Sequence, residues 1–159
     1  MLSTEIVRAM IDYHYARQYG LWDSIMTLTD EQFTTEIPYS HGSIRNHMVH
    51  LPAVDTRWLK GLREEADART FNYEPPDYPT RESARMLTEK VADEVKQYIA
   101  TLDDEALAYV PQGMPLARWQ VILHVVNHGT DHRAQVLRIL HDFGAPTFEQ
   151  DLSYYFFGE

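Results

Sequence analysis

The chain has 159 residues, a length that suits one compact domain with an ordinary hydrophobic core. Its 14 Lys and Arg residues against 24 Asp and Glu residues give a formal net charge of -10, and no basic cluster interrupts the acidic background. This charge disfavours a phosphate-backbone or acidic-membrane partner. We therefore expect a single domain over residues 1–159 that binds neither nucleic acid nor membrane.

Cysteine is absent, which excludes both a disulfide framework and a cysteine-based zinc site. Any metal must be held by His, Asp or Glu. The N-terminal stretch MLSTEIVRAMIDYHYARQYG carries Glu5 and Asp12 and lacks the unbroken apolar core of a signal peptide. No apolar run approaches the roughly 18 residues of a membrane span. These features predict a soluble, cytoplasmic protein.

Four long segments have apolar residues at helical spacing, and Pro, Gly or polar residues separate them. The predicted helices cover approximately residues 3–28, 43–62, 81–102 and 115–143. The fourth should stop at the sequence Gly-Ala-Pro that begins at Gly144.

The pattern predicts an all-α fold, a four-helix bundle, because four amphipathic helices occur without an internal repeat or strand-like alternation. The Pro-rich connector between the second and third helices, TFNYEPPDYPTRES, is long for a link between adjacent antiparallel helices. We expect a long crossover at this connector. The aromatic C-terminal tail should pack on the body, with Tyr154 to Phe157 closing one end of the bundle.

Three histidines, His124, His128 and His132, follow one another at about one helical turn within HVVNHGTDHRAQ. At about 100° per residue, His128 and His132 fall within about 20° of Val121 on the apolar stripe, and His124 falls at its edge. Two buried imidazoles leave ring nitrogens that need partners. A spacing of four residues is also typical of helical histidine pairs that hold zinc. The alternative is a buried, titrating pair without a metal.

A third ligand has to come from elsewhere, because catalytic sites of this kind use three protein ligands and keep one position open. His47 and His50 are the candidates, both early in the second helix. Helical projection places His47 more inward, but Pro52 makes an ideal projection unreliable in this helix. The residues alone leave both candidates open.

His14 and Arg17 lie near the apolar face of the first helix and are candidate pocket residues. A buried Arg is unusual without a partner, so Arg17 could pair with a carboxylate or approach an anionic substrate. It could equally extend along the bundle end with its guanidinium in water.

HVVNHGTDHRAQ resembles the fourth-helix signature of the DinB/YfiT-like metalloenzyme family, in which Asn-His is followed by His-Arg, a small residue and Gln. HLPAVDTRWL is similar to the second-helix signature, and LTDEQF and DLSYYF also fit. The resemblance covers most of the chain, and the fourth helix is its specific part. The chain departs from the pattern at Asp131 and Ala134, where the family often has His and Gly, which puts an inherited substrate specificity in doubt.

The resemblance implies a divalent metal held by His50, His128 and His132, and it selects His50 over His47. His47, His124 and Asp131 are then alternative ligands or neighbours of the site. Zinc or nickel is expected, with iron as a further option, since imidazole suits all three. The family includes S-transferases that use bacillithiol or mycothiol. A thiol-dependent S-transferase acting on a small molecule, with a low-molecular-weight thiol as cosubstrate, is therefore implied, as is a homodimer.

Three functions stay open at this point. Three neutral imidazoles leave a divalent ion its full charge, so it can lower the pKa of a bound thiol or of bound water. The ligand set therefore permits a metal-dependent hydrolase as well as a transferase. A non-enzymatic stress protein that binds a metal or small ligand is the third option, because no nucleophile or general base stands out.

Overall fold

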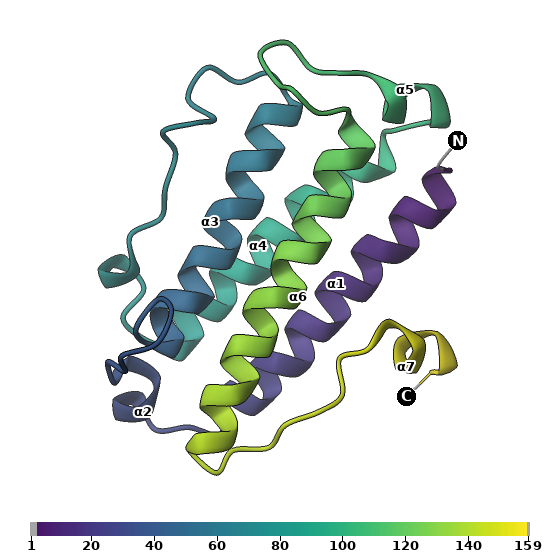
Figure 1. Ribbon diagram of the computed structural model, residues 1–159. Coiled ribbons are helices and arrows are strands. Elements are labelled where there is room, and N and C mark those ends of the chain that lie inside the picture. The colour runs from purple at the N-terminus through teal and green to yellow at the C-terminus, as the bar shows by residue number, and fades with distance from the viewer. Residues whose placement is uncertain (1–2, 159) are drawn as a thin grey trace.

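The computed structural model describes residues 3–158, which are helical or irregular and contain no strand. Four long helices form a bundle (Figure 1): α1 (Thr4–Ile25), α3 (Ile44–Leu62), α4 (Arg81–Ala100) and α6 (Arg118–Asp142). The connections contain α2 (Asp30–Thr34), a short 3-10 turn η1 (Pro75–Asp77), α5 (Asp104–Ala108) and, in the tail, α7 (Leu152–Phe157). The predicted all-α four-helix bundle is confirmed. No helix within residues 3–158 combines the length and apolarity needed to cross a membrane.

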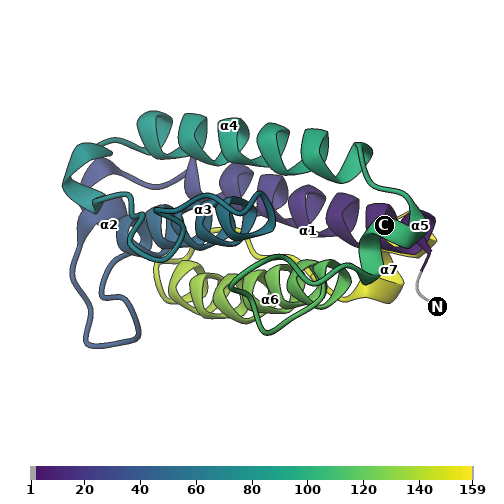
Figure 2. The same ribbon diagram turned by 90° about the horizontal axis from the view of Figure 1, so that it is seen from above.

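The bundle places α4 and α6 on opposite sides, with α1 and α3 between them (Figure 2). Accordingly, α3 packs against both α4 and α6, and α1 packs against the same two helices. Helices α3 and α4 run in the same direction, since their C-terminal ends lie together. The Tyr98 hydroxyl near the end of α4 donates to the carbonyl of Leu62 at the end of α3, at 3.1 Å. The connector returns along the bundle to make this possible (Figure 1). The predicted crossover is therefore also confirmed.

Polar caps set where the helices near the site begin. The Ser43 hydroxyl accepts a hydrogen bond from the backbone N–H of Asn46 at the start of α3, and the Thr80 hydroxyl accepts one from Ser83 at the start of α4. Each cap provides an acceptor for a backbone N–H that has no partner within the helix. Pro52 lies inside α3 without ending it. As a result, one uninterrupted helix carries His47, His50 and the residues that follow.

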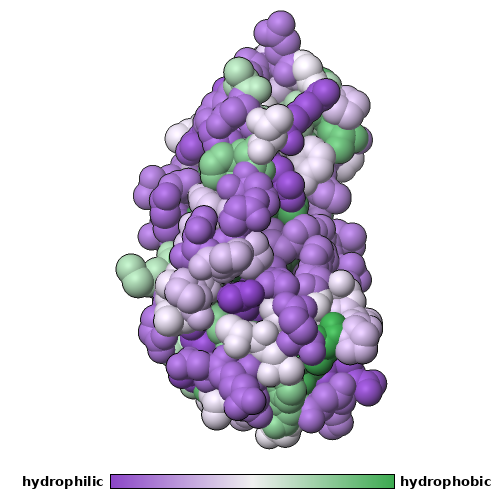
Figure 3. Space-filling view, turned by 90° about the vertical axis from the view of Figure 1, so that its left-hand side faces the viewer, coloured by the Kyte–Doolittle hydropathy of each residue, from purple (hydrophilic) through white to green (hydrophobic). Residues whose placement is uncertain are grey.

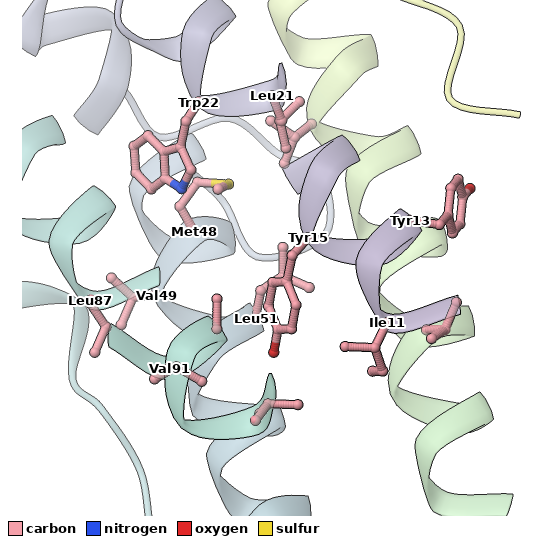
Figure 4. Close-up of a cluster of buried hydrophobic side chains, with 14 of the residues drawn as sticks. Ile11, Tyr13, Tyr15, Leu21, Trp22, Met48, Val49, Leu51, Leu87 and Val91 are labelled. Atoms are coloured by element: carbon pink, nitrogen blue, oxygen red, sulfur yellow. The ribbon is translucent and has the colours of Figure 1, made fainter. Parts of the chain in front are cut away.

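The apolar core fills the space between the long helices. Figure 4 shows Tyr15 from α1, Leu51 from α3 and Val91 from α4 pointing into a shared interior, and all three are almost fully buried. Polar side chains are also buried, chiefly along α1, α3 and α6: His14, Gln18, His47, Asp55, His132 and Arg133. Burying a polar group without a partner costs free energy. These polar residues therefore indicate where the interior contains a hydrogen-bonded network or a binding site.

The C-terminal tail lies on the body, as expected, but only part of it is covered. The Tyr155 ring meets the Tyr13 ring edge-on at 5.6 Å, and the Tyr13 hydroxyl donates to the carbonyl of Gln150 at 2.7 Å. Phe156 and Phe157, in contrast, are 60% and 76% exposed. Tyr154 is exposed too, at 38%. The prediction that the whole aromatic run closes one end of the bundle is therefore wrong for all but Tyr155, since consecutive residues of the short α7 cannot all face the bundle.

The side of the molecule that carries α2 and the connector is mostly hydrophilic, with only scattered apolar atoms (Figure 3). This matches the acidic composition and shows no broad apolar patch on that face.

Candidate metal centre

Five of the eight histidines gather between α3, α6 and the loop that precedes α3. They are His41, His47, His50, His128 and His132, and ring-to-ring contacts link them all. Helix α3 supplies two of them, α6 supplies two, and the loop over residues 35–43 supplies His41. The structure thus brings together all three histidines of the expected triad and adds two more.

The distances within this cluster fit a shared ion. Nε2 of His50 lies 3.3 Å from Nε2 of His128, and the His132 ring centroid lies 4.8 Å from that of His50 and 4.4 Å from that of His128. Two nitrogens bound at about 2.0–2.1 Å to a tetrahedral zinc lie about 3.3 Å apart. The same separation is long for a direct N–H···N hydrogen bond. The His50–His128 pair is therefore spaced as two ligands of one cation would be.

A second set of three overlaps the first. The ring nitrogens of His41, His50 and His132 all lie within 4.8 Å of one another, and the His41 ring stacks on that of His50 with centroids 4.0 Å apart. His128 joins this set through its contact with His50. Sequence reasoning missed His41, because a loop residue carries no periodic signal. The two sets share His50 and His132 and differ only in whether His128 or His41 is the third member.

The loop that presents His41 is held in one conformation by its neighbours. Ser40 has a φ of 50° and Gly42 a φ of 89°, so the backbone on both sides of His41 is left-handed, which is strained for a serine. The Ser40 hydroxyl donates to Oε1 of Gln135 on α6, and Nε2 of Gln135 donates to Oδ2 of Asp131 at 3.1 Å. Asp131, predicted as a neighbour of the metal, therefore helps to fix the loop that carries His41.

The clustered imidazoles are neutral at pH 7 and available as ligands. Burial lowers the pKa of His47 and of His128 to about 4, and that of His50 to about 3, with the neighbouring histidines adding to each shift. Both ring nitrogens of His47, and Nδ1 of His128 and of His132, are buried without a hydrogen-bond partner in residues 3–158. A cluster of buried, neutral imidazoles fits cation binding, since a bound ion would compensate for the lost hydration of the nitrogens that face it.

Comparison with known proteins places this bundle in a family. The DinB family model matches residues 3–158, nearly the whole chain. The chain belongs to the DinB family. The fold agrees, since the crystal structure of a DinB-like protein from Bacillus cereus aligns with a TM-score of 0.74 and 19% sequence identity, covering 92% of this chain and 98% of that one. A search of the curated proteins finds none that matches.

The metal-free DinB-family protein is expected to lose stability as the pH falls. His47, His50 and His128 have folded-state pKa values of about 4, 3 and 4, against an ordinary 6.5. Below about pH 6.5 the unfolded chain takes up protons that the folded chain does not, so unfolding becomes easier until the folded pKa values are passed. The urea midpoint of EDTA-treated protein should fall between about pH 6.5 and 4. A flat midpoint over this range would contradict the buried, neutral cluster.

The remaining predicted site residues lie outside the cluster. His124 is exposed on α6, and its ring packs on that of Trp58 at 4.9 Å. Arg17 lies over the Tyr155 ring at 5.7 Å, beside the tail. His14 is buried in the interior rather than lining an open pocket. Of these three residues, His124 touches the edge of the cluster, with its ring 6.0 Å from that of His128.

His14 belongs to a buried network that ties α1, α3 and α6 together. Nη1 of Arg133, itself 0% exposed, lies 3.1 Å from Nδ1 of His14, and Nε2 of His14 lies 3.5 Å from Oδ2 of Asp55. Because a guanidinium can only donate, Nδ1 of His14 accepts and Nε2 carries the proton that faces Asp55. The Tyr15 hydroxyl also donates to Oδ2 of Asp55, at 3.1 Å. Sequence reasoning gave neither Asp55 nor Arg133 a role, although both lie inside the two quoted signatures.

Asp55 is also close enough to His128 for its charge to act on that ring. Its Oδ1 and Nδ1 of His128 are both buried without a hydrogen-bond partner among the described residues, and the negative charge of Asp55 acts on His128, opposing the fall of its pKa caused by burial. Metal-bound histidines usually donate their second ring N–H to a carboxylate or carbonyl, and loss of that acceptor costs roughly 10–100-fold in metal affinity. We expect Asp55→Asn to weaken zinc binding by about this factor, measured by competition with a chelator. Unchanged affinity in the folded variant would remove Asp55 from this role.

Proposed function

We propose that this protein is a divalent-metal-dependent enzyme whose ion is held by His50, His128 and His132. The observation that carries the proposal is the 3.3 Å separation of the His50 and His128 Nε2 atoms, with His132 packed against both rings. Three neutral imidazoles suit zinc, nickel and iron. Zinc or nickel is the expected ion.

We infer that the reaction is a thiol-dependent S-transfer to a small molecule. When bound, a divalent cation lowers the pKa of a coordinated thiol, so that thiolate is available near neutral pH. The chain has no cysteine, so the thiol has to be a low-molecular-weight cosubstrate. Family membership supports this choice over hydrolysis, for which the same ligand set would also serve.

The chain's own residues have three tasks in this proposal. The five-histidine cluster supplies ligands that are neutral at pH 7, since burial keeps the pKa values of His50 and His128 low. The loop that presents His41 covers one face of the His50 ring, because those two rings stack. His47 packs a neutral, fully buried imidazole against the His132 ring, with neither ring nitrogen hydrogen-bonded to a described residue, and so helps to keep water from the ligands.

The test is a screen of the metal-loaded protein for conjugation of small thiols to electrophiles, and in parallel for ester and amide hydrolysis. Thiol consumption that depends on added zinc or nickel and disappears in His132→Ala supports the transferase. Metal-dependent hydrolysis without thiol consumption would replace the transferase by the hydrolase. Tight metal binding with no turnover of either kind would leave a metal-binding protein.

The homodimer, the cytoplasmic location and the single-domain organisation over residues 1–159 stay predictions. The oligomeric state can be measured by light scattering of the purified chain.

A further inference from the structure

A pocket lies one helical turn beyond the candidate metal centre along α3. It has a volume of about 550 Å³, within the range of pockets that hold small organic ligands. The second half of α3 forms one wall, and the loops over residues 64–69 and 112–115 form the others. Both loops are at the upper end of the bundle in Figure 1, above α3 and α6.

The pocket wall continues the stripe of α3 that carries His50. Val54, Arg57, Trp58 and Gly61 line the pocket, at 4, 7, 8 and 11 residues after His50. At about 100° per residue these positions fall within an arc of about 100° on one face of the helix. On α6 the ring of His124 bridges the two regions, because it lies 4.9 Å from that of Trp58 and 6.0 Å from that of His128. A ligand in the pocket therefore lies on the same face of α3 as His50, next to the histidine cluster.

Arg57 is the cation in this wall without a partner. It makes no hydrogen bond or ion pair with any residue between 3 and 158, although it is only partly exposed. The acidic residues of the lining are already engaged. Glu64 accepts hydrogen bonds from the Tyr109 hydroxyl at 2.9 Å and from the backbone of Gln112 at 2.6 Å, and Glu65 pairs with Lys60 at 2.6 Å. An unpaired guanidinium in a concave, partly apolar site is suited to a carboxylate, which it can bind through two parallel hydrogen bonds.

We propose that this pocket binds the substrate of the metal centre as an organic acid with an apolar or aromatic body, with Arg57 holding the carboxylate and Trp58 packing on the body. This inference rests on the proposed function in one respect, namely that the histidine cluster is where the substrate reacts. Arg57 lies seven residues beyond His50, about 10 Å along the helix axis. A molecule of about that length can reach the metal with one end while its carboxylate meets Arg57.

The test compares an acid with its neutral amide. The probes are 3-phenylpropanoate and 3-phenylpropanamide, and binding is followed by NMR at the Trp58 indole N–H of the full-length protein, assigned with Trp58→Phe. We expect the acid to shift this resonance and to bind at least tenfold more tightly than the amide, both as purified and after EDTA treatment. Arg57→Gln should remove the preference. Arg63→Gln, which deletes the same charge on an exposed side chain near the end of the helix, should keep it.

Equal affinity for the two probes, or no shift of Trp58 by either at tens of millimolar, would overturn the proposal. These results come from the wild-type protein and do not depend on whether Arg57→Gln folds. A preference that disappears with EDTA would also overturn it, because the metal would then be the carboxylate's partner while the proposed function would stand. Failure of metal binding itself is detected separately, by metal analysis of the same sample.

Discussion

His128→Ala is expected to lose stoichiometric zinc, whereas His41→Ala keeps about one ion per chain. The two overlapping sets of three differ only in these two residues, so the pair of variants decides between them. His128 is favoured because its Nε2 lies 3.3 Å from that of His50, as two nitrogens on one tetrahedral zinc would, although the ring nitrogens of His41, His50 and His132 also lie within 4.8 Å of one another. Mutating a residue that orients a metal ligand lowers metal affinity by roughly 10–100-fold, and removing the ligand itself should lower it further. The affinity of His128→Ala should therefore fall by more than about 100-fold.

The measurement is metal analysis after dialysis against zinc, on protein made without a histidine tag, together with calorimetric titration. His132→Ala belongs to both sets and should also lose the ion. His141→Ala is the matched control, since His141 lies on the same helix and is exposed. Retention of zinc by His128→Ala with its loss in His41→Ala would assign the loop histidine as the third ligand. If His128→Ala, His132→Ala and His41→Ala all retain zinc, the histidine cluster is not the metal site.

Gly129→Ala is expected to destabilise the fold by about 2 to 4 kcal/mol, although alanine favours a helix by up to about 1 kcal/mol over glycine. Gly129 is buried in α6 next to His128, and a Cβ there would lie 2.2 Å from Cε1 and 2.5 Å from Nδ1 of His14, and 2.9 Å from Nη1 of Arg133. Neither neighbour can withdraw easily, because each is hydrogen-bonded in the buried network. The added methyl group therefore separates α1 from α6 or breaks the His14–Arg133 contact.

Urea unfolding measures this effect, with Gly20→Ala as the control. Gly20 is also helical, but a Cβ there would meet only the Phe148 ring, at an ordinary 3.4 Å. Gly20→Ala should therefore be neutral or slightly stabilising. If Gly129→Ala proves as stable as Gly20→Ala, the close approach of His14 to α6 is not a constraint on this fold.

The four long helices and two of the histidines of the candidate metal centre could be predicted from local sequence pattern. Apolar spacing identified the four long helices, and the crossover followed from the length of the connector. The same periodicity put His128 and His132 on the inward stripe of α6 and His124 at its edge. Helical projection was also correct that His47 is more buried than His50, while the resemblance to the family selected the histidine that contacts His128.

What the sequence alone determined is the set of residues that each helix turns inward, because burial of an amphipathic helix follows from spacing within one segment. Which inward residues meet was decided by how the helices pack. His41 reaches the centre through a loop fixed to α6 by Ser40 and Gln135, and no periodic signal marks that position. His14 meets Arg133 across 119 residues only because Gly129 lets α1 approach α6 closely. Such contacts depend on side chains from separate segments fitting together in three dimensions, so only the tertiary structure shows them.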